Sequence, residues 1–231
     1  MIEIGLLVFP GVQQLDLTAP YEVFASWPEA RVHLVGKNRD DIVASTGLRL
    51  RPDVSFAECP RLDVICVPGG AGVNALLLDD ETLDFLRVRA GEARYVASVC
   101  TGALALGAAG LLRGKRATTH WAFLDLLSPF GAIPTTGRVV RDGALITGGG
   151  VTAGLDFALA LVGEIAGRAA AEAIQLHLEY RPAPPFDAGG PETAPPSVVE
   201  AYRARGAALR AERERLVERA AQRLGPPDVT G

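Results

Sequence analysis

The chain has 231 residues, of which 48% are hydrophobic and 22% charged, and its formal net charge is −4. This composition is typical of a globular domain, and no block of cations is present for nucleic-acid binding, so nucleic acid is not an expected partner. The three cysteines are odd in number and lack metal-ligand spacing, which indicates free thiols in a reducing, cytoplasmic compartment.

Short apolar runs rich in β-branched residues predict four buried strands. The first run has no basic region before it and is too short to cross a membrane, so no membrane partner is expected. The runs are continuous rather than alternating, which is typical of parallel strands covered by helices on both faces. They span Ile2 to Phe9, Arg31 to Gly36, Leu62 to Gly70 and Arg94 to Cys100.

Helical patterns alternate with these strands, so we expect an α/β fold with a doubly wound, mostly parallel sheet. The helices between the strands are expected over Pro20 to Trp27, Asp80 to Ala90, Gly102 to Leu112 and His120 to Leu127. Two hairpins, with turns at residues 47 and 142–143, would add antiparallel strands to this sheet. Two further helices, separated near Gly167, are expected over 151–167 and 169–180.

The composition changes sharply after residue 180, where the α/β domain is predicted to end. Residues 181–196 contain six prolines and two glycines, which forbid helix and sheet and predict an extended connector. Residues 197–231 are predicted to form a charged helical arm. Its thin apolar seam would rest either on its own domain or on a second subunit; the seam comprises Val199, Tyr202, Leu209 and Leu216.

Cys100 stands where the fourth strand ends and a run of small residues begins. It would lie on a sharp strand-to-helix turn, which resembles the elbow that presents a nucleophilic serine in hydrolases. The following helix would point its N-terminus at the sulfur, which would lower the thiol pKa to roughly 3.5–7.5. A small buried hydrophobe is the structural alternative for this cysteine. Cys59 and Cys66 have no such turn and are predicted to be structural.

Two other strand ends carry residues that could assist this thiol, because ligands of parallel sheets bind beyond the carboxyl ends of the strands. Asp16 lies in an apolar loop, which would raise its pKa and suit it to proton transfer; a helix N-cap is the alternative. The N–H groups of Gly69, Gly70 and Thr101 can form an oxyanion-type hole, although a plain tight turn is equally compatible with "PGGAG".

Several quoted segments together resemble the ThiJ/PfpI superfamily, with its class I glutamine amidotransferase-like fold, and more narrowly its isocyanide hydratase branch. The resemblance covers residues 2 to about 191 and rests on the segments "FPGVQQLDLTAPYEVF", "VPGGAG", "VCTGALALGAAGLLRGKRATTHW", "ITGGGVTAGLDFAL" and "QLHLEYRPAPPFDAGGP". It implies a flavodoxin-like domain, a homodimer, and no metal or organic cofactor.

The resemblance also implies roles for single residues. Cys100 matches the elbow nucleophile, Asp16 the acid beside it, and Gly69, Gly70 and Thr101 the hole-forming backbone. Thr101 stands where protease-like relatives commonly have histidine, which argues against amide hydrolysis. The implied reaction is hydration of an isocyanide, R–N≡C, to an N-substituted formamide through a thioimidate on Cys100, with Asp16 as general acid and base.

Two histidines are candidates for a third catalytic group. His120 is expected near the pocket, where relatives place a histidine, although a helix-start residue bonded to backbone is the favoured interpretation. The pair His177 and Glu179 imitates an amidotransferase triad, but it lies at a helix end and is interpreted as a coincidence. Gly150, before the helix that opens at Val151, is interpreted either as a hinge near the pocket or as a simple turn.

Two other functions remain open. A glyoxalase-like or deglycase-like activity on small aldehydes would also use a thiol and an acid. This activity usually needs a histidine beside the thiol, and the chain has Thr101 there. The same central segment occurs in the sensing domains of AraC-type regulators. About 35 residues follow the proline-rich stretch, too few for the two helix-turn-helix motifs that follow such a domain.

Overall fold

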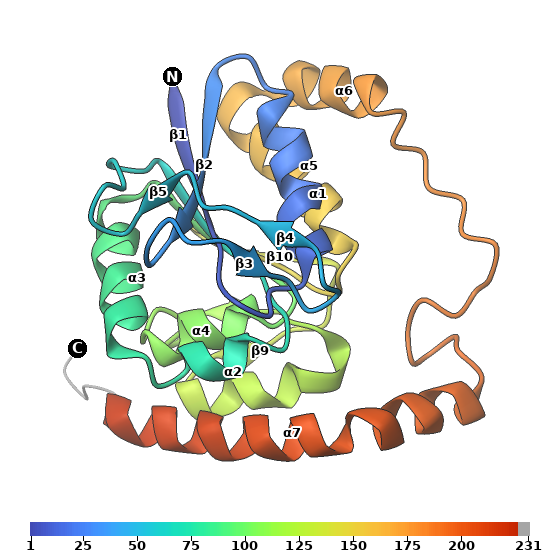
Figure 1. The fold of residues 1–231 in the computed structure, drawn as a ribbon. Helices are drawn as coiled ribbons and strands as arrows, with labels where there is room; N and C mark the ends of the chain where they lie inside the picture. The colour runs from blue at the N-terminus through green and yellow to red at the C-terminus, as the bar shows by residue number, and fades with distance from the viewer. Residues whose placement is uncertain (226–231) are drawn as a thin grey trace.

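A seven-stranded sheet forms the centre of the computed structural model, which describes residues 1–225 (Figure 1). The strand order is β10-β11-β7-β6-β1-β2-β5, and all neighbours are parallel except β10 and β11. The predicted mostly parallel sheet is therefore confirmed. The strands are β1 (Ile2–Leu7), β2 (Ala30–Gly36), β5 (Val54–Ser55), β6 (Val64–Val67), β7 (Tyr95–Val99), β10 (Val139–Asp142) and β11 (Leu145–Gly148).

Helices cover both faces of the sheet, as the continuous apolar strands require. Successive strand residues point to opposite faces, so Cys66 and Val67 belong to different hydrophobic clusters. One face is covered by α1 (Gln14–Ala25), α5 (Ala153–Ala166) and α6 (Arg168–His177). The other is covered by α2 (Val73–Leu76), α3 (Asp80–Glu92), α4 (Gly102–Ala108), the 3-10 helix η1 (Trp121–Phe130) and α7 (Pro196–Leu224).

Of the two predicted hairpins, one joins the main sheet and the other does not. The turn at Asp142 and Gly143 joins β10 to β11; β10 is the predicted antiparallel addition, whereas β11 is parallel to β7. The hairpin around Gly47 is antiparallel, but its strands β3 (Ile42–Val43) and β4 (Arg49–Leu50) form a separate two-stranded sheet. Its backbone instead bonds the loop after β1, where Gly11 N–H donates to Val43 O and Ser45 N–H donates to Val12 O. A further short pair comprises β8 (Arg116–Ala117) and β9 (Ile133–Pro134).

Helix α1 begins six residues earlier than the sequence predicts, at Gln14 instead of Pro20. Pro20 lies inside the helix and cannot donate the usual backbone hydrogen bond. Burial of Leu17, Val23 and Phe24 against the sheet offsets that loss. As a consequence, Asp16 occupies the first turn of a helix rather than a loop.

The helix after the elbow and the following segment also differ from their predicted bounds. Helix α4 ends at Ala108 rather than near Leu112, because Gly110 adopts a left-handed conformation with φ of 81°. The segment expected as a helix over 120–127 is the 3-10 helix η1, which continues to Phe130.

The chain from 178 to 195 contains neither helix nor strand, whereas the predicted connector spans 181–196. It leads away from α6 and returns to α7 on the other face of the molecule (Figure 1). Helix α7 packs on its own domain, against α2, α4 and η1, and buries Arg213, Val217 and Ala220. Residues 226–231 of the predicted arm lie outside the described residues. Between residues 1 and 225, no helix has the length and apolarity needed to span a membrane.

Candidate active site

Cys100 occupies the turn between β7 and α4 in a left-handed backbone conformation, with φ of 53°. Such a φ is strained for a residue with a side chain and persists only when the surroundings hold it. Here Cys100 N–H donates to Gly148 O at 3.0 Å, and the Thr119 hydroxyl donates to Cys100 O at 2.7 Å. The strained elbow that the sequence predicts is therefore present.

Glycines allow the neighbouring backbone to approach this elbow closely. A Cβ at Gly102 would lie 2.0 Å from Val67 O, and a Cβ at Gly69 would lie 2.5 Å from the Thr101 nitrogen. Both distances are far shorter than van der Waals contact. The elbow therefore packs against the β6 end only because these two positions lack a side chain.

Asp16 reaches the elbow from the first turn of α1 and is completely buried. Its Oδ2 accepts a hydrogen bond from Gly69 N–H at 2.9 Å, whereas its Oδ1 has no partner of normal geometry within residues 1–225. Burial raises the pKa of this carboxyl to about 7, although the Gly69 bond and the Cys100 thiol oppose the rise. The raised pKa is as predicted. The N-cap alternative is wrong, because Gln13 caps α1.

The predicted low pKa of the Cys100 thiol is wrong for this structure. Burial raises the thiol pKa, and the Asp16 carboxylate raises it further. The Thr101 N–H and the Arg213 cation lower it, but they do not balance the loss of water. Cys100 is therefore a thiol at neutral pH, and a base must take its proton before it can attack.

The N–H groups of Gly69 and Gly70 already donate within the protein. Gly69 orients the Asp16 carboxyl, and Gly70 N–H donates to the Thr101 hydroxyl at 3.0 Å. Their predicted role as donors to the substrate stays a prediction. The Thr101 N–H instead interacts directly with the thiol of Cys100.

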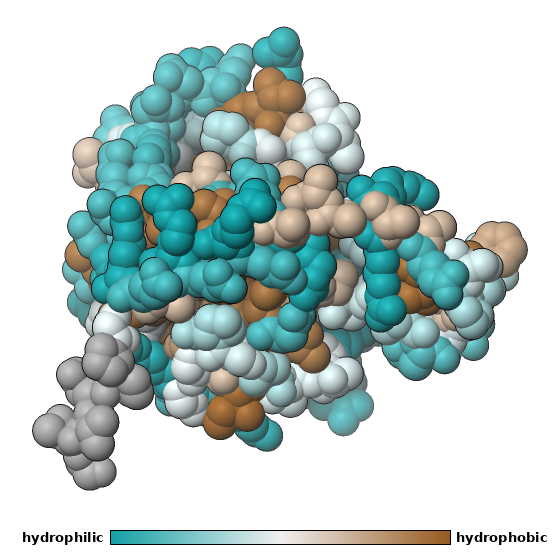
Figure 2. Space-filling view, turned by 90° about the horizontal axis from the view of Figure 1, so that it is seen from below, coloured by the Kyte–Doolittle hydropathy of each residue, from teal (hydrophilic) through white to brown (hydrophobic). Residues whose placement is uncertain are grey.

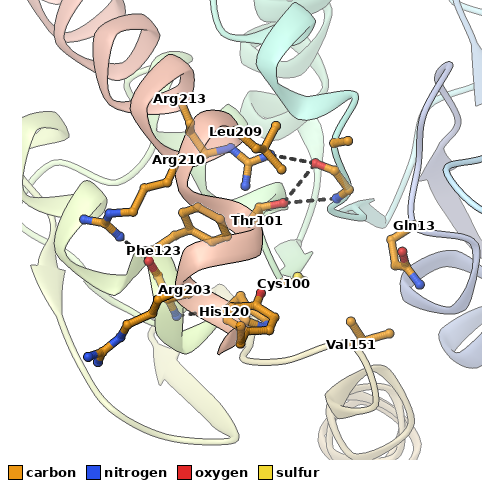
Figure 3. A pocket seen from close by; sticks show the side chains of 15 residues that line it. Gln13, Cys100, Thr101, His120, Phe123, Val151, Arg203, Leu209, Arg210 and Arg213 are labelled. Carbon is orange, nitrogen blue, oxygen red and sulfur yellow. Dashed lines mark hydrogen bonds between the residues drawn. The ribbon is translucent and has the colours of Figure 1, made fainter. Parts of the chain in front are cut away.

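A cavity of about 210 Å³ opens above Cys100 (Figure 3). Most of its lining is apolar or aromatic, and all the charged side chains in it are arginines. Its walls come from the loops after β1 and β6, the elbow, the start of η1, the turn before α5, and α7. The principal lining residues are Gln13, Ala71, Thr101, Ala122, Phe123, Val151, Tyr202, Arg203, Leu209, Arg210 and Arg213.

His120 lines this cavity and caps η1, with its Nδ1 accepting from Ala122 N–H at 3.3 Å. The favoured interpretation of this histidine, a helix-start residue bonded to backbone, is thus confirmed. Burial, together with the nearby Arg213 cation, lowers its pKa to about 4, so the ring is neutral at pH 7. It lies against the Tyr202 ring, with 5.9 Å between the ring centroids.

The remaining predicted residues separate into those near the cavity and those away from it. Val151 lines the cavity, whereas Gly150 does not, and the role of Gly150 as a hinge stays a prediction. His177 is exposed at the end of α6, away from Cys100, which agrees with its interpretation as a coincidence. Cys59 and Cys66 are buried outside the cavity lining.

The contribution of α7 to this site was missed at the sequence level. Six lining residues come from this helix, among them the fully buried Arg213. The signal available was spacing, because Tyr202, Leu209 and Arg213 recur at intervals of seven and four residues on one helix face. The predicted apolar seam contains Tyr202 and Leu209 but not Arg213.

Residues 3–164 match the sequence pattern of the DJ-1/PfpI family. The chain belongs to the DJ-1/PfpI family. It is 60% identical to the isonitrile hydratase of Pseudomonas putida over 223 residues, which cover 96% of this chain and 98% of that protein.

Solved structures of this family have the same fold. The crystal structure of a ThiJ/PfpI family protein from Pseudomonas syringae superimposes with a TM-score of 0.91 at 45% identity and covers 94% of this chain and 90% of its own. Drosophila melanogaster DJ-1beta superimposes with a TM-score of 0.69 at 24% identity, covering 78% of this chain and 99% of its own. The flavodoxin-like class implied by the resemblance is therefore confirmed.

The burial of Asp16 predicts a pH-dependent effect of Asp16→Asn on stability. The folded protein keeps the Asp16 proton up to about pH 7, whereas the ordinary pKa of an aspartate carboxyl in water is 3.8. The free energy of unfolding of the wild type therefore contains a contribution that is full below about pH 4 and is lost as the pH rises through about 7. Asparagine does not ionise, so the variant gains stability relative to the wild type over this interval, by up to roughly 4 kcal/mol.

Urea denaturation at pH 4, 6 and 8 measures this difference. The exposed carboxylate Asp41 provides the matched control Asp41→Asn, for which no comparable change is expected. A stability difference between Asp16→Asn and wild type that is the same at every pH would contradict the burial argument.

Proposed function

We propose that this protein is an isocyanide hydratase, which adds water to R–N≡C and releases an N-substituted formamide. The observation that carries the proposal is the 60% identity to an isonitrile hydratase over almost the whole of both chains, isonitrile being another word for isocyanide. The elbow cysteine with a buried carboxyl beside it supports the same reaction, since one thiol and one proton-transfer group suffice for it.

In the first step, Asp16 takes the proton of the Cys100 thiol. Its pKa of about 7 suits a group that must accept and return a proton near neutral pH. The sulfur then forms a bond to the terminal carbon of the isocyanide, and Asp16 returns the proton to that carbon. The product is a thioimidate, R–N=CH–S, attached to Cys100.

In the second step, water attacks the thioimidate carbon. Asp16, again a carboxylate, takes a proton from this water and passes it to the nitrogen as the tetrahedral intermediate forms. The hydroxyl of this intermediate then becomes the carbonyl as the carbon–sulfur bond breaks, and its proton passes through Asp16 to the Cys100 sulfur as the formamide R–NH–CHO leaves. Atoms and charge balance over the cycle, and the Asp16–Cys100 pair returns to its starting state.

The cavity walls suit an apolar substituent on the isocyanide nitrogen. Phe123, Val151, Tyr202 and Leu209 provide apolar surface, while Thr101 N–H lies next to the sulfur, where charge develops. His120 adds an uncharged aromatic ring to the cavity wall. An aryl isocyanide is therefore a suitable test substrate.

Turnover of an aryl isocyanide to its formamide tests the reaction and the two roles together. We expect Cys100→Ala to abolish turnover, because no thioimidate forms without the sulfur. Asp16→Asn should lower kcat/KM by about 10²–10⁴-fold, the usual contribution of a general acid or base. Cys66→Ala, which removes a buried thiol outside the cavity, is the matched control and should retain turnover.

Two outcomes would contradict this assignment. Full activity of Cys100→Ala would exclude the covalent route. No turnover by the wild type, together with alkylation of Cys100, would mean that the elbow is reactive but acts on another substrate, with small aldehydes as the next class to assay.

The pH profile of kcat/KM tests Asp16 as the first base. Because this residue must be a carboxylate to accept the thiol proton, kcat/KM should rise with pH through about 7 and then level off. Stopped assays with the aryl isocyanide from pH 5 to 9 measure this dependence. A rate that falls over pH 5 to 7 would instead require a protonated Asp16 in the free enzyme.

We also propose that the protein acts as a homodimer in the cytoplasm. Exposed apolar side chains support an interface with a second copy of the chain, since Leu176 on α6 is 82% exposed and Phe186 in the connector is 78% exposed. The free thiols of all three cysteines fit a reducing compartment. Sedimentation equilibrium should give twice the chain mass of 24.3 kDa, and a value equal to one chain would contradict the dimer.

A further inference from the structure

Arg213 is a buried cation without a carboxylate partner among residues 1–225. Its exposure is 1%, and it lies on the face of α7 that points to the cavity. Two other arginines of this helix form ion pairs: Arg210 with Asp125 and Glu214, and Arg223 with Asp80. A buried charge is costly unless an opposite charge or strong hydrogen bonds compensate for the lost water. Arg213 therefore requires another explanation than an ion pair.

The contacts of its guanidinium are polar but neutral. Nε donates to Asn74 Oδ1 at 2.7 Å, Nη2 donates to Gly70 O at 2.9 Å, and the group lies 4.4 Å from the Phe123 ring centroid. Figure 3 shows the side chain extending from α7 toward Thr101. The contacts hold the cation beside the Gly70 loop, which in turn bonds the Thr101 hydroxyl. They orient the positive charge without neutralising it.

The ionisable groups around Arg213 leave one main candidate for its counter-charge. Glu212, which is exposed on α7, accepts a hydrogen bond from Asn74 and interacts with the guanidinium less strongly than Cys100 does. Tyr202 on the same helix is a neutral phenol at physiological pH, with its pKa raised by burial. His120, at the start of η1, is neutral. Asp16, on α1, interacts with Cys100, and no interaction of Asp16 with Arg213 is found among the described residues. The Cys100 sulfur is thus the group in the cavity that becomes negative during the reaction.

We propose that Arg213 is a positioning residue that supplies the positive field in which the Cys100 thiolate forms and fixes the Gly70 loop against Thr101. The inference rests on the proposed function, because it takes Cys100 as the nucleophile. The thiolate needs such a field, since burial and the Asp16 carboxylate both oppose negative charge on the sulfur. The mutual Coulomb interaction of Arg213 and Cys100 lowers the thiol pKa and raises that of the guanidinium.

The position of Arg213 gives α7 a part in catalysis. This helix lies beyond residue 164, where the match to the family pattern ends. Its outer surface is mostly hydrophilic (Figure 2), whereas Arg213 points inward with Val217 and Ala220. Helix α7 therefore contributes a charge to the interior, in addition to covering the cavity.

The rate of Cys100 alkylation tests this role without any isocyanide. Iodoacetamide is uncharged and reacts with the thiolate, so its rate at a fixed pH follows the thiolate fraction. We compare wild type with Arg213→Lys, which keeps the charge, and with Arg213→Met and Arg213→Gln, which remove it. Mass spectrometry of the Cys100 peptide separates its reaction from those of Cys59 and Cys66, at pH 6 to 10.

We expect both neutral variants to react about tenfold or more slowly at pH 8, since loss of a nearby opposite charge raises a thiol pKa by roughly one unit or more. Arg213→Lys should stay within about threefold of wild type. Arg223→Met, the same substitution at an exposed position of α7, should leave the rate unchanged. Val217→Ala, which loosens α7 without changing charge, should lower thermal stability but not the alkylation rate at pH 8.

The outcomes are decisive in each direction. A wild-type rate in Arg213→Gln, or an equal loss in the lysine and neutral variants, would overturn the electrostatic role. A similar slowing in Val217→Ala would show that helix docking, and not charge, controls the thiol. Because alkylation needs no substrate, this test stands even if isocyanide turnover fails, and the two failures remain distinguishable.

Discussion

The left-handed backbone of Cys100 is the constraint on which the site depends. A side chain in this conformation points its sulfur away from the sheet and toward the cavity, yet the conformation is strained. Hydrogen bonds to the Cys100 peptide groups from two neighbouring segments hold it in place. Close packing across Gly69 and Gly102 adds to this support, because any Cβ there would collide with backbone. The α/β architecture thus converts the end of one strand into a fixed reactive position.

Three buried ionisable groups, Asp16, Cys100 and Arg213, lie at the base of the cavity or beside it, and the charge on each affects the ionisation of its neighbour. The Asp16 carboxyl and the Cys100 thiol both resist ionisation because they are buried, and a charge on either disfavours a charge on the other. A single proton passing between them avoids two adjacent negative charges. The buried cation of Arg213 lies close enough to favour the thiolate form. The reactive state is therefore reached by proton transfer rather than by a permanently low thiol pKa.

Helix α7 joins stability to function in this chain. Its inward face packs Val217 and Ala220 on the domain, and the same face continues along the cavity to Leu209 and Tyr202. A strongly charged helix such as this one takes most of its stability from packing, so its docking and the shape of the cavity depend on the same face. The connector runs from α6 to α7 and so allows α7, which is distant in sequence, to reach the elbow (Figure 1).

The pairing of the thiol with Asp16 was implied by the family resemblance, whereas local sequence patterns determined the strands, the parallel sheet and the elbow at Cys100. These features follow from apolar periodicity and from glycines next to the strand ends, which act over a few residues. Tertiary structure alone decided the rest. Asp16 lies in a helix because burial of the α1 face outweighs the effect of Pro20, and the thiol pKa rises because lost hydration exceeds the helix-terminus effect. Arg213 joins the site across more than a hundred residues, since packing of α7 brings together positions that no local pattern connects.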